Sequence, residues 1–553
     1  MREPTGADDA GHPQNPFERE ILTPQSPAAD RQLETEKAGR RVWLDLHLLL
    51  WILLAVAAVV LAVCAVRMAG LAADDAFIHR RIARNYQTLG QPYFNVNQRV
   101  MVTSSPLWTI LLAASGATLP VANPVPWLEW IFMLLGAAAA YLLLLHAADR
   151  ESHLSTLVFP ALAFLWVFGA NFLSAISQME TPCAIALMLW GCLGIATKKN
   201  WGMPLLVLAC FCRYECVLLC FFAALWVTRS RRWTKAYLLI SSGIGLLGLV
   251  WLLREYGTLI PNTVIAKSHL YLISYRHVAG GLVGSKWGKV VYPVLAVLWW
   301  LYGRDRRVRP DPVAIILVGF GASLGVAYVV RKTFIFSWYL PLVWVPLAIG
   351  ILLLTNRKQT RPAIVGAGLT AAMLVPLFWS DLSILPVALR EPPGNMAGFA
   401  ESARVHEYRR IGAALYQQCP SGTLMTSEIG GLGWGFQGTI LDGAGLGSPE
   451  AIRYHPMRVP QERSNGGLGE IPPGFIRERH PDLIVSYDAF AEAALPAARS
   501  LGYIDYAYPM FVRGEREGMD DLWGARQMHV LVSPDGRCSP PAVDQAVRAA
   551  LEK

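Results

Sequence analysis

Long apolar runs separated by short polar loops occupy most of the chain between residues 48 and 380. The first run, 48–66, has no charged residue and is long enough to cross a hydrocarbon core of roughly 30 Å. Similar runs follow near 106–118, 124–146, 155–173, 182–197, 203–211, 216–228, 236–253, 288–302, 312–330, 336–354 and 362–379. This pattern predicts a polytopic α-helical membrane protein with about eleven to thirteen transmembrane helices.

The regions on either side of these runs are polar. Residues 1–42 are rich in Pro, Asp, Glu, Gln and Arg without apolar periodicity, which is typical of a disordered tail. After residue 380 the long apolar runs give way to charged residues, Gly and Pro. We therefore predict a disordered cytoplasmic tail (1–42), a transmembrane domain (43–380) with a polar first loop at 68–105, and a soluble domain (381–553).

The soluble domain has the pattern of a small α/β fold. Short apolar stretches predict buried strands at 423–427, 439–442, 482–487 and 528–532. Tyr408, Ile411 and Leu415 fall on one face of a helix predicted before the first strand.

A glycine motif in this domain matches the dinucleotide-binding fingerprint at Gly433, Gly435 and Gly438. The fingerprint requires a helix directly after the glycines, whereas this motif leads into a predicted strand. We therefore interpret these residues as glycines of tight turns.

Composition and charge narrow the class of protein further. Hydrophobic residues make up 54% of the chain and charged residues 16%, which excludes a string of soluble domains. The net charge of +9 falls largely in short loops between apolar runs, and no basic face with interleaved aromatic residues is present. We expect membrane lipid, and no nucleic acid, among the partners.

Loop charges predict the orientation in the membrane. The positive-inside rule places the most basic loops in the cytoplasm, namely 198–199, 229–235, 304–309 and 357–361. The outer side then holds the loops 68–105, 177–181, 213–215, 255–285 and 331–334, together with everything after residue 380. In this topology the short run 106–118 has no place as a full crossing, so it is re-entrant or wrongly bounded, and the helix count stays a range.

Cysteine positions give one structural expectation. Seven of the nine cysteines lie in or beside apolar runs, where a thiol behaves mostly as a small hydrophobe. The cluster at 210–220 has no matching His or second Cys pair, which favours helix packing over metal binding. Cys419 and Cys538 lie in the soluble domain and are able to form a disulfide if that domain is extracytoplasmic.

Asp74 and Asp75 open the most polar stretch next to the membrane. Adjacent side chains diverge by roughly 100° on a helix, so one carboxylate can face a reacting centre while the other fixes the loop or helps to hold a cation. A partly desolvated carboxylate tends to have a raised pKa and can accept a proton from a substrate hydroxyl. We interpret the pair as catalytic, with helix capping as the alternative.

The other outer loops add charged and hydrogen-bonding side chains, namely Glu180, Arg213, Glu215, Lys267, Arg331, Lys332, Trp338 and Tyr339. The cations suit a phosphate leaving group and suit lipid head groups equally well. Glu180 and Glu215 also have a structural interpretation as ion-pair partners of Arg213. Trp338 and Tyr339 fit an interfacial aromatic belt better than a sugar-stacking site.

These motifs resemble those of the GT-C glycosyltransferases, in the same order, over roughly residues 45–345. The family's first extracytoplasmic loop is similar to Asp74-Asp75-Ala76-Phe77-Ile78, Ala83-Arg84-Asn85, Phe94-Asn95, Arg99-Val100 and Ser105-Pro106-Leu107-Trp108. Later family motifs resemble Met179-Glu180-Thr181-Pro182, Arg213-Tyr214-Glu215, Pro261-Asn262-Thr263 with Ala266-Lys267, and Trp338-Tyr339 with Pro341. Within the superfamily, the pattern is most similar to bacterial arabinofuranosyltransferases of the terminal cell-wall arabinan type. That family often has Thr, Gly and Pro where His79, Gln178 and Tyr214 stand, and these differences bear on the identity of the sugar.

The resemblance implies a reaction and its substrates. It implies a polyprenyl-phosphate sugar as donor, with arabinofuranose as the best match, and an extracytoplasmic glycan, lipid or protein as acceptor. It further implies a multi-pass protein of the bacterial inner membrane, with a cytoplasmic N-terminus and a periplasmic or extracellular C-terminal α/β domain.

The resemblance also implies roles for individual residues. Asp74 or Asp75 would be the base that deprotonates the acceptor hydroxyl, and the two carboxylates would be the ligands of a divalent cation (Mg²⁺, Mn²⁺ or Ca²⁺) if one is used. The donor phosphate would be bound by Lys267, Arg213 and Arg331. The remaining substrate contacts would come from His79, Arg84, Asn85, Glu180, Glu215, Asn262, Trp338 and Tyr339.

Three other functions fit part of the pattern. A related enzyme would transfer a different lipid-linked sugar to protein or lipid A. A transporter or lipid-linked-sugar flippase would carry its ionisable residues near the bilayer midplane and show internal repeats. No such repeat is evident, and the polar residues singled out above sit at helix ends. A membrane-anchored binding protein would place its function in residues 385–553.

Overall fold

A computed structural model describes residues 48–63, 72–118, 125–148, 154–229, 235–271, 273–285, 288–289, 311–356, 400–457, 470–509 and 527–552. The predicted tail, the apolar runs at 362–379 and over most of 288–302, and the domain boundary at residue 380 lie outside these ranges. The chain divides into two compact units, Met1–Trp51 and Ile52–Lys553. In the first unit the described residues are 48–51, which are helical. The helices and sheet described below belong to the second unit.

Apolar helices of membrane-spanning length form one part of this unit. Among the described residues, five helices are long and apolar enough to cross a bilayer, namely Val125–His146, Thr156–Ile176, Tyr237–Tyr256, Pro312–Val330 and Ser337–Leu354. They correspond to the helices labelled α4 (Val125–His146), α5 (Phe159–Ile176), α9 (Lys235–Tyr256), α13 (Pro312–Val330) and α14 (Leu340–Asn356). On α9 the large apolar side chains of Leu239 and Leu247 are 70% and 73% exposed, as expected for a surface that faces lipid.

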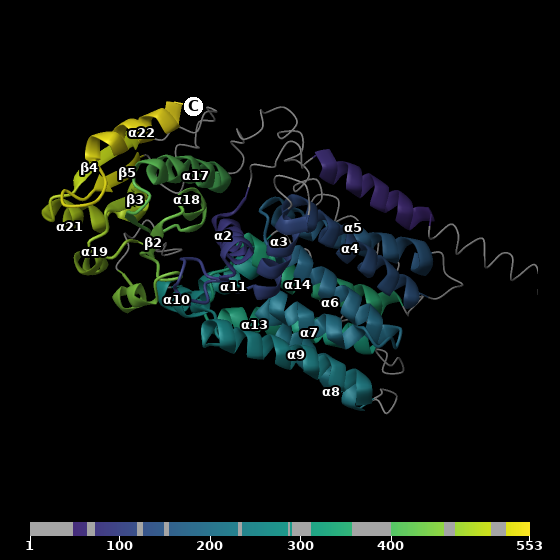
Figure 1. Ribbon diagram of the computed structural model, residues 1–553. Helices are drawn as coiled ribbons and strands as arrows, with labels where there is room; N and C mark the ends of the chain where they lie inside the picture. Colours follow the sequence, from purple (N-terminus) through teal and green to yellow (C-terminus); the bar gives the residue numbers. More distant parts are fainter. Residues whose placement is uncertain are drawn as a thin grey trace, which may run out of the picture. The chain divides into compact units, whose positions relative to one another are not determined.

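Shorter apolar helices complete this part (Figure 1). They are α3 (Pro106–Thr118), α6 (Thr181–Ala196), α7 (Gly202–Cys212) and α8 (Val217–Arg229). With 13 residues, α3 is about 20 Å long, which is too short for a full crossing of a hydrocarbon core of roughly 30 Å. The length of α3 therefore explains why the run 106–118 has no place as a full crossing in the predicted topology. In the α6–α7 hairpin a Cβ at Gly202 would lie 2.8 Å from the backbone nitrogen of Ile195, so only glycine permits this approach.

The polar loop that carries the aspartate pair begins with a helix, α2 (Asp74–Leu89). Two acidic residues in its first turn interact favourably with the unpaired N–H groups at a helix N-terminus. The helix ends at Gly90, whose φ of 68° is left-handed and lets its N–H bond back to the carbonyls of Asn85 and Tyr86. The side chain of Asn85 then donates to the carbonyls of Tyr93 (2.9 Å) and Phe94 (3.0 Å), which folds the following segment against α2.

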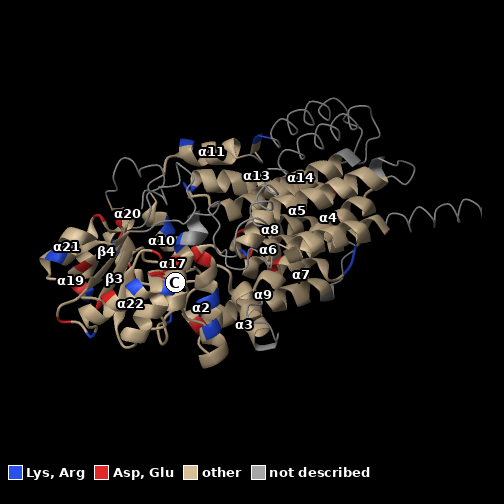
Figure 2. Ribbon diagram, turned by 90° about the horizontal axis from the view of Figure 1, so that it is seen from above, with Lys and Arg blue, Asp and Glu red and all other residues tan. Residues whose placement is uncertain are grey.

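Smaller elements connect the apolar helices at the same end as α2. They are η2 (Tyr214–Cys216), α10 (Asn262–Leu270), α11 (Tyr275–Gly284) and η3 (Ser337–Tyr339). Figure 2 shows that charged residues are sparse along the apolar helices and frequent around α2, α10 and the C-terminal region.

The C-terminal region contains a five-stranded mixed sheet in the order β2-β1-β3-β5-β4. Its strands are β1 (Thr423–Thr426), β2 (Thr439–Asp442), β3 (Leu483–Tyr487), β4 (Ile504–Pro509) and β5 (Gln527–Val532). Strands β2, β1 and β3 are parallel, whereas β5 is antiparallel to both β3 and β4. The predicted α/β fold and four predicted strands are confirmed, and β4 was missed.

Helices cover both faces of this sheet (Figure 1). Alternate strand residues point to opposite sides, so Leu424 packs with the α17 residues Tyr408, Ile411 and Leu415, while Met425 packs on the other face. The helices are α17 (Ala400–Gln418), α18 (Gly430–Gly435), η4 (Pro449–Tyr454), α19 (Pro473–Arg479), α20 (Asp488–Ala491), α21 (Ala494–Ser500) and α22 (Pro540–Glu552). The predicted disulfide is present, between Cys419 at the end of α17 and Cys538 before α22.

The interpretation of the glycine motif was wrong in one respect. Gly433 and Gly435 lie in the short helix α18 and not in tight turns, although a strand follows them as predicted. Their physical role is close packing, since a Cβ at Gly435 would lie 2.3 Å from the carbonyl oxygen of Arg409 in α17.

Candidate active site

Four of the loops predicted to lie on the outer side meet at one end of the apolar helices. The backbone N–H of Ala73 donates to the carbonyl of Ser177 (3.0 Å), which joins the start of α2 to the α5–α6 loop. Asp75 of α2 accepts a hydrogen bond from Lys267 of α10 (3.0 Å). Arg213, from the α7–α8 connection, pairs with Glu180 of the α5–α6 loop. The prediction that these loops share one side is therefore confirmed by their mutual contacts.

A cavity of about 500 Å³ lies where these loops converge. Its apolar wall includes Ile78, Val102, Leu218 and Leu324, and its size lies within the ordinary range for small-molecule sites. Six residues predicted from the sequence line it, namely Asp75, His79, Glu215, Lys267, Arg331 and Tyr339.

Asp75 and Lys267 form the ion pair of this cavity. Their side chains are 23% and 21% exposed, so the pair is accessible but partly desolvated. Burial alone would lower the pKa of Lys267, but the carboxylate of Asp75 outweighs it and holds that pKa well above the ordinary value. Lys267 is therefore a cation at neutral pH, and its ammonium also lies 4.8 Å from the ring centre of Phe336.

A second group of cations lies at the exposed part of the cavity. Arg331 ends α13 and is exposed, and in the described part of the chain no carboxylate pairs with it. Its neighbour Lys332 also lines the cavity and lies 4.5 Å from the ring centre of Tyr275. Arg331 is thus available to an incoming anion, whereas Lys267 already has a partner.

Asp74 does not line the cavity but points to the C-terminal domain. Its two carboxylate oxygens accept hydrogen bonds from the backbone N–H groups of Gly430 (2.9 Å) and Gly431 (2.8 Å), which begin α18. Burial, followed by repulsion from Glu428, raises the pKa of Asp74 to about 7. The adjacent aspartates thus face different surroundings, with Asp75 at the cavity and Asp74 at a backbone contact.

Arg213 is enclosed by two carboxylates. Its guanidinium bonds Glu180 and reaches both oxygens of Glu215 (2.5 and 3.1 Å), and all three residues are buried. These acids hold the pKa of Arg213 well above its ordinary value against the opposing effect of burial. Tyr328 donates to Glu215 (3.1 Å), and the ring centre of Tyr339 lies 4.5 Å from the Arg213 guanidinium. The structure therefore shows the ion-pair alternative for Arg213, which does not line the cavity.

His79 links this buried cluster to the cavity wall. Its Nε2 lies 3.6 Å from a Glu180 oxygen and its Nδ1 lies 3.0 Å from the hydroxyl of Thr103. Burial is the main influence and lowers the pKa of His79, which keeps the imidazole neutral near pH 7.

Four other predicted substrate contacts have structural partners outside the cavity. Arg84 lies 4.5 Å from the ring centre of Trp434, and Asn85 holds the loop after α2 as described above. The side chain of Asn262 donates to the carbonyls of Gly445 and Leu446, both at 2.7 Å. Trp338 is 3% exposed and packs with Phe77 and Met179 in an apolar cluster.

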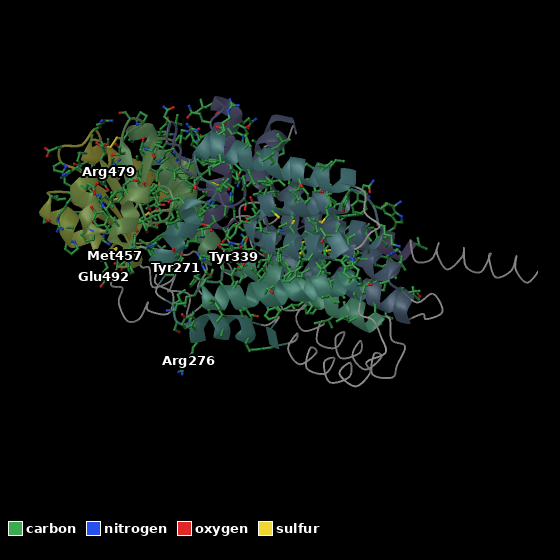
Figure 3. All side chains as sticks on the ribbon, turned by 90° about the horizontal axis from the view of Figure 1, so that it is seen from below. Tyr271, Arg276, Tyr339, Met457, Arg479 and Glu492 are labelled. Atoms are coloured by element: carbon green, nitrogen blue, oxygen red, sulfur yellow. A yellow bond between two sulfur atoms is a disulfide. The ribbon has the colours of Figure 1, made fainter. Side chains whose placement is uncertain are left out.

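The cavity also contains polar residues to which sequence reasoning assigned no role, namely Ser104, Tyr214, Thr263, Ser268, Tyr271, Tyr328 and Thr333. Tyr271 and Tyr339 lie close together in the region between the apolar helices and the C-terminal sheet (Figure 3). Tyr271 stacks on Phe334 with ring centres 4.9 Å apart, which fixes its orientation. Tyr214 and Thr263 belong to the motifs Arg213-Tyr214-Glu215 and Pro261-Asn262-Thr263, whereas a lone tyrosine after α10 carries no motif.

The aspartate pair does not fit a divalent cation in this arrangement. The oxygens of Asp74 are engaged by two backbone N–H groups, and the ammonium of Lys267 lies beside Asp75 where a metal would have to bind. Among the described residues, no group of three or more His, Cys, Asp or Glu side chains is arranged to hold a metal ion. The reaction proposed below therefore contains no step through a metal.

The fold and the site define a class of protein. Apolar helices of membrane-spanning length carry at one end a cavity with apolar walls and charged side chains, beside a helix that begins with two aspartates and a C-terminal α/β region. The described helices and sheet make this a multi-pass α-helical membrane protein with a C-terminal α/β domain, as predicted.

Comparison with known proteins gives the same fold. No protein-family model matches the sequence, and no curated protein matches it. Two crystal structures of ArnT from Cupriavidus metallidurans are similar at 12% sequence identity and a TM-score of 0.50. The structure bound to undecaprenyl phosphate matches over 88% of this chain and 98% of its own, and the apo structure over 87% and 97%.

Proposed function

We propose that this protein is a membrane glycosyltransferase that moves a sugar from a polyprenyl-phosphate donor to an acceptor hydroxyl. The observation that carries the proposal is a cavity with apolar walls at the ends of membrane helices, which holds the carboxylates of Asp75 and Glu215 together with several cations. A lipid-linked phosphate can reach such a cavity laterally from the bilayer. The similar fold of ArnT, crystallised with undecaprenyl phosphate, supports a donor of this kind.

In the proposed reaction Asp75 is the general base. The acceptor hydroxyl gives its proton to the carboxylate of Asp75 while its oxygen bonds to the anomeric carbon of the donor sugar. The bond between that carbon and the phosphate oxygen breaks, and the electron pair leaves with the polyprenyl phosphate. Because Asp75 lines the cavity and Asp74 does not, we assign the base to Asp75.

The cations of the cavity stabilise the departing phosphate. Arg331 offers a forked donor suited to phosphate, and Lys267 lies 3.0 Å from Asp75 and is able to turn from the carboxylate to the phosphate. Turning away would release Asp75 to accept the acceptor proton. One residue thus couples charge stabilisation with activation of the base.

We place the cavity and the C-terminal domain on the extracytoplasmic side of the bacterial inner membrane, with the N-terminus in the cytoplasm. The basic loops predict this orientation, and the disulfide between Cys419 and Cys538 supports it because disulfides persist in oxidising compartments. The acceptor is then an extracytoplasmic glycan, lipid or protein, and arabinofuranose is the sugar that the sequence motifs favour.

The test is a donor panel. Purified protein in nanodiscs is incubated with radiolabelled polyprenyl-phosphate arabinofuranose, aminoarabinose, mannose and glucose, together with short arabinan, lipid A and peptide acceptors. We expect label from one lipid donor to appear in an acceptor and free polyprenyl phosphate to accumulate. If proteoliposomes move the intact lipid-linked sugar across the bilayer without cleaving it, the flippase alternative replaces this proposal.

A further inference from the structure

Helix α2 satisfies both ends of α18 in the C-terminal domain. Gly430 and Gly431 begin α18, so their N–H groups have no acceptor within the helix, and Asp74 accepts both. At the other end Arg81 donates to the carbonyls of Gly433, Phe436 (2.6 Å) and Gly438 (2.7 Å). Asp74 and Arg81 are seven residues apart, about 10 Å along a helix, which matches the length of roughly 9 Å for the six residues of α18.

The contact between α2 and α18 is closely packed, and the buried charge of Arg81 relies on it for hydrogen-bond acceptors. Arg81 is 1% exposed, and its remaining donors bond the Phe94 carbonyl (2.8 Å) and the Asn95 side chain (3.3 Å), so displacement of α18 would leave a buried guanidinium short of acceptors. A Cβ at Gly430 would lie 1.8 Å from the carbonyl oxygen of Asp74. The spacing between the two helices therefore tolerates no added methyl group.

The same stretch of the C-terminal domain also holds α10. Asn262, the first residue of α10, donates to the carbonyls of Gly445 and Leu446 just beyond β2. Ile78 and Ile82 of α2 and Ala266 of α10 belong to the same apolar cluster as the core of the C-terminal sheet. Segment 429–448 thus contacts both the helix that carries Asp75 and the helix that carries Lys267.

We propose that segment 429–448 of the C-terminal domain positions α2 against α10, with Asp74 and Arg81 as positioning residues, and so sets the contact between Asp75 and Lys267. The assignment of Asp75 as base rests on the proposed function, but the positioning itself does not require any transfer reaction. The C-terminal domain then holds the active-site helices in register and is more than a separate acceptor-binding module.

The test measures the environment of Lys267 directly. In the full-length protein in nanodiscs, each lysine is acetylated over a pH series, and its rate is read by peptide mass spectrometry. In wild type the partner carboxylate keeps Lys267 protonated and slow to react. In Gly430→Ala, which changes no charge and no cavity residue, we expect the acetylation rate of Lys267 at pH 9 to rise at least fivefold.

Matched variants separate positioning from general damage. Gly447→Ala lies in the same segment, where an added Cβ has no neighbour closer than 3.5 Å, and it should leave the rate unchanged. Asp74→Asn serves as a second, milder disruption if Gly430→Ala does not fold. An unchanged Lys267 rate in the folded Gly430→Ala or Asp74→Asn protein, or an equal rise in Gly447→Ala, would overturn the proposal. If a variant loses sugar transfer while the acetylation rate of Lys267 stays unchanged, the positioning role is contradicted and the proposed function is not.

Discussion

At the scale of single residues, the structure gives two adjacent aspartates different partners. The sequence shows only that the side chains of Asp74 and Asp75 diverge, and it permits either one to act as the base. The partners of Asp74 are backbone N–H groups 356 and 357 residues later in the chain, so no local pattern predicts which of the two faces the cavity. The role of Arg213 was likewise not predictable from local sequence. Its charge suggests phosphate binding, but the structure shows that it pairs with two buried carboxylates.

Replacement of Arg331 should weaken donor binding. A charge-assisted hydrogen bond contributes about 1.5–3 kcal/mol, so Arg331→Gln should raise the KM for the lipid donor by roughly tenfold to a hundredfold. The measurement is the initial rate of transfer over a series of donor concentrations. Arg276→Gln is the matched control, because Arg276 is exposed on α11 and lies at the outer edge in Figure 3. Equal KM values for all three proteins would contradict the role of Arg331.

Removal of the Arg213 guanidinium should destabilise the fold. Arg213→Met leaves Glu180 and Glu215 buried without their cation, which costs about 3–5 kcal/mol when one partner of a buried pair is lost. The change is measured as a lower thermal midpoint in detergent. Adding Glu180→Gln and Glu215→Gln to the same protein should recover part of the loss. A midpoint that stays at the wild-type value would show that the pair has no structural role.

The raised pKa of Asp74 predicts a pH-dependent difference in stability. A carboxyl with a pKa of about 7 in the folded protein and an ordinary value near 3.8 when unfolded binds more protons in the folded state between those values. Its contribution therefore favours folding at acidic pH and is lost as the pH rises through about 7. We therefore compare the thermal midpoints of wild type and Asp74→Asn. The midpoint of wild type minus that of the variant should decrease as the pH is raised from 5 to 8. A difference that rises with pH would show that burial does not dominate at Asp74.

At the scale of elements, the hydrophobic pattern predicts the helices and strands in which apolar and polar residues alternate clearly. The bounds of β2 match the prediction, those of β1, β3 and β5 differ by one residue, and the apolar face of α17 is buried as expected. Strand β4 was missed because it lies at the sheet edge, where most of its residues are partly or fully exposed and a proline ends it. The glycines of α18 were misinterpreted because glycine is required there by the close approach of α2 and α17. A local sequence pattern does not predict contacts with helices so far away in the chain.

The disulfide should stabilise the C-terminal region. It closes a loop with a sequence separation of 119 residues, for which loss of chain entropy in the unfolded state predicts about 5 kcal/mol. Replacing both Cys419 and Cys538 by Ser should therefore lower the thermal midpoint. Adding dithiothreitol should lower the midpoint of wild type and leave that of the double variant unchanged. If the double variant and wild type unfold at the same temperature, the disulfide contributes nothing to stability.

At the scale of the whole molecule, the distribution of loop charges predicts which connections share a side. The loops around α2, 177–181, 213–215 and α10 contact one another, as that grouping requires. The cavity itself was not predictable, because its walls come from five separate stretches of chain and half of its polar residues belong to no motif. The fold class, by contrast, was predicted from the apolar runs and the strand pattern, although sequence identity to the ArnT structures is only 12%.

The central claim is that Asp75 accepts a proton during transfer of a lipid-linked sugar. It is tested most directly by the single-turnover rate of transfer at saturating donor, measured for wild type, Asp75→Asn and the exposed control Asp535→Asn. Because a positioned general base contributes roughly 10²–10⁴-fold, we expect Asp75→Asn to lose at least a hundredfold in rate while Asp535→Asn retains the wild-type rate. An Asp75→Asn protein that transfers sugar within a few-fold of the wild-type rate would contradict the account.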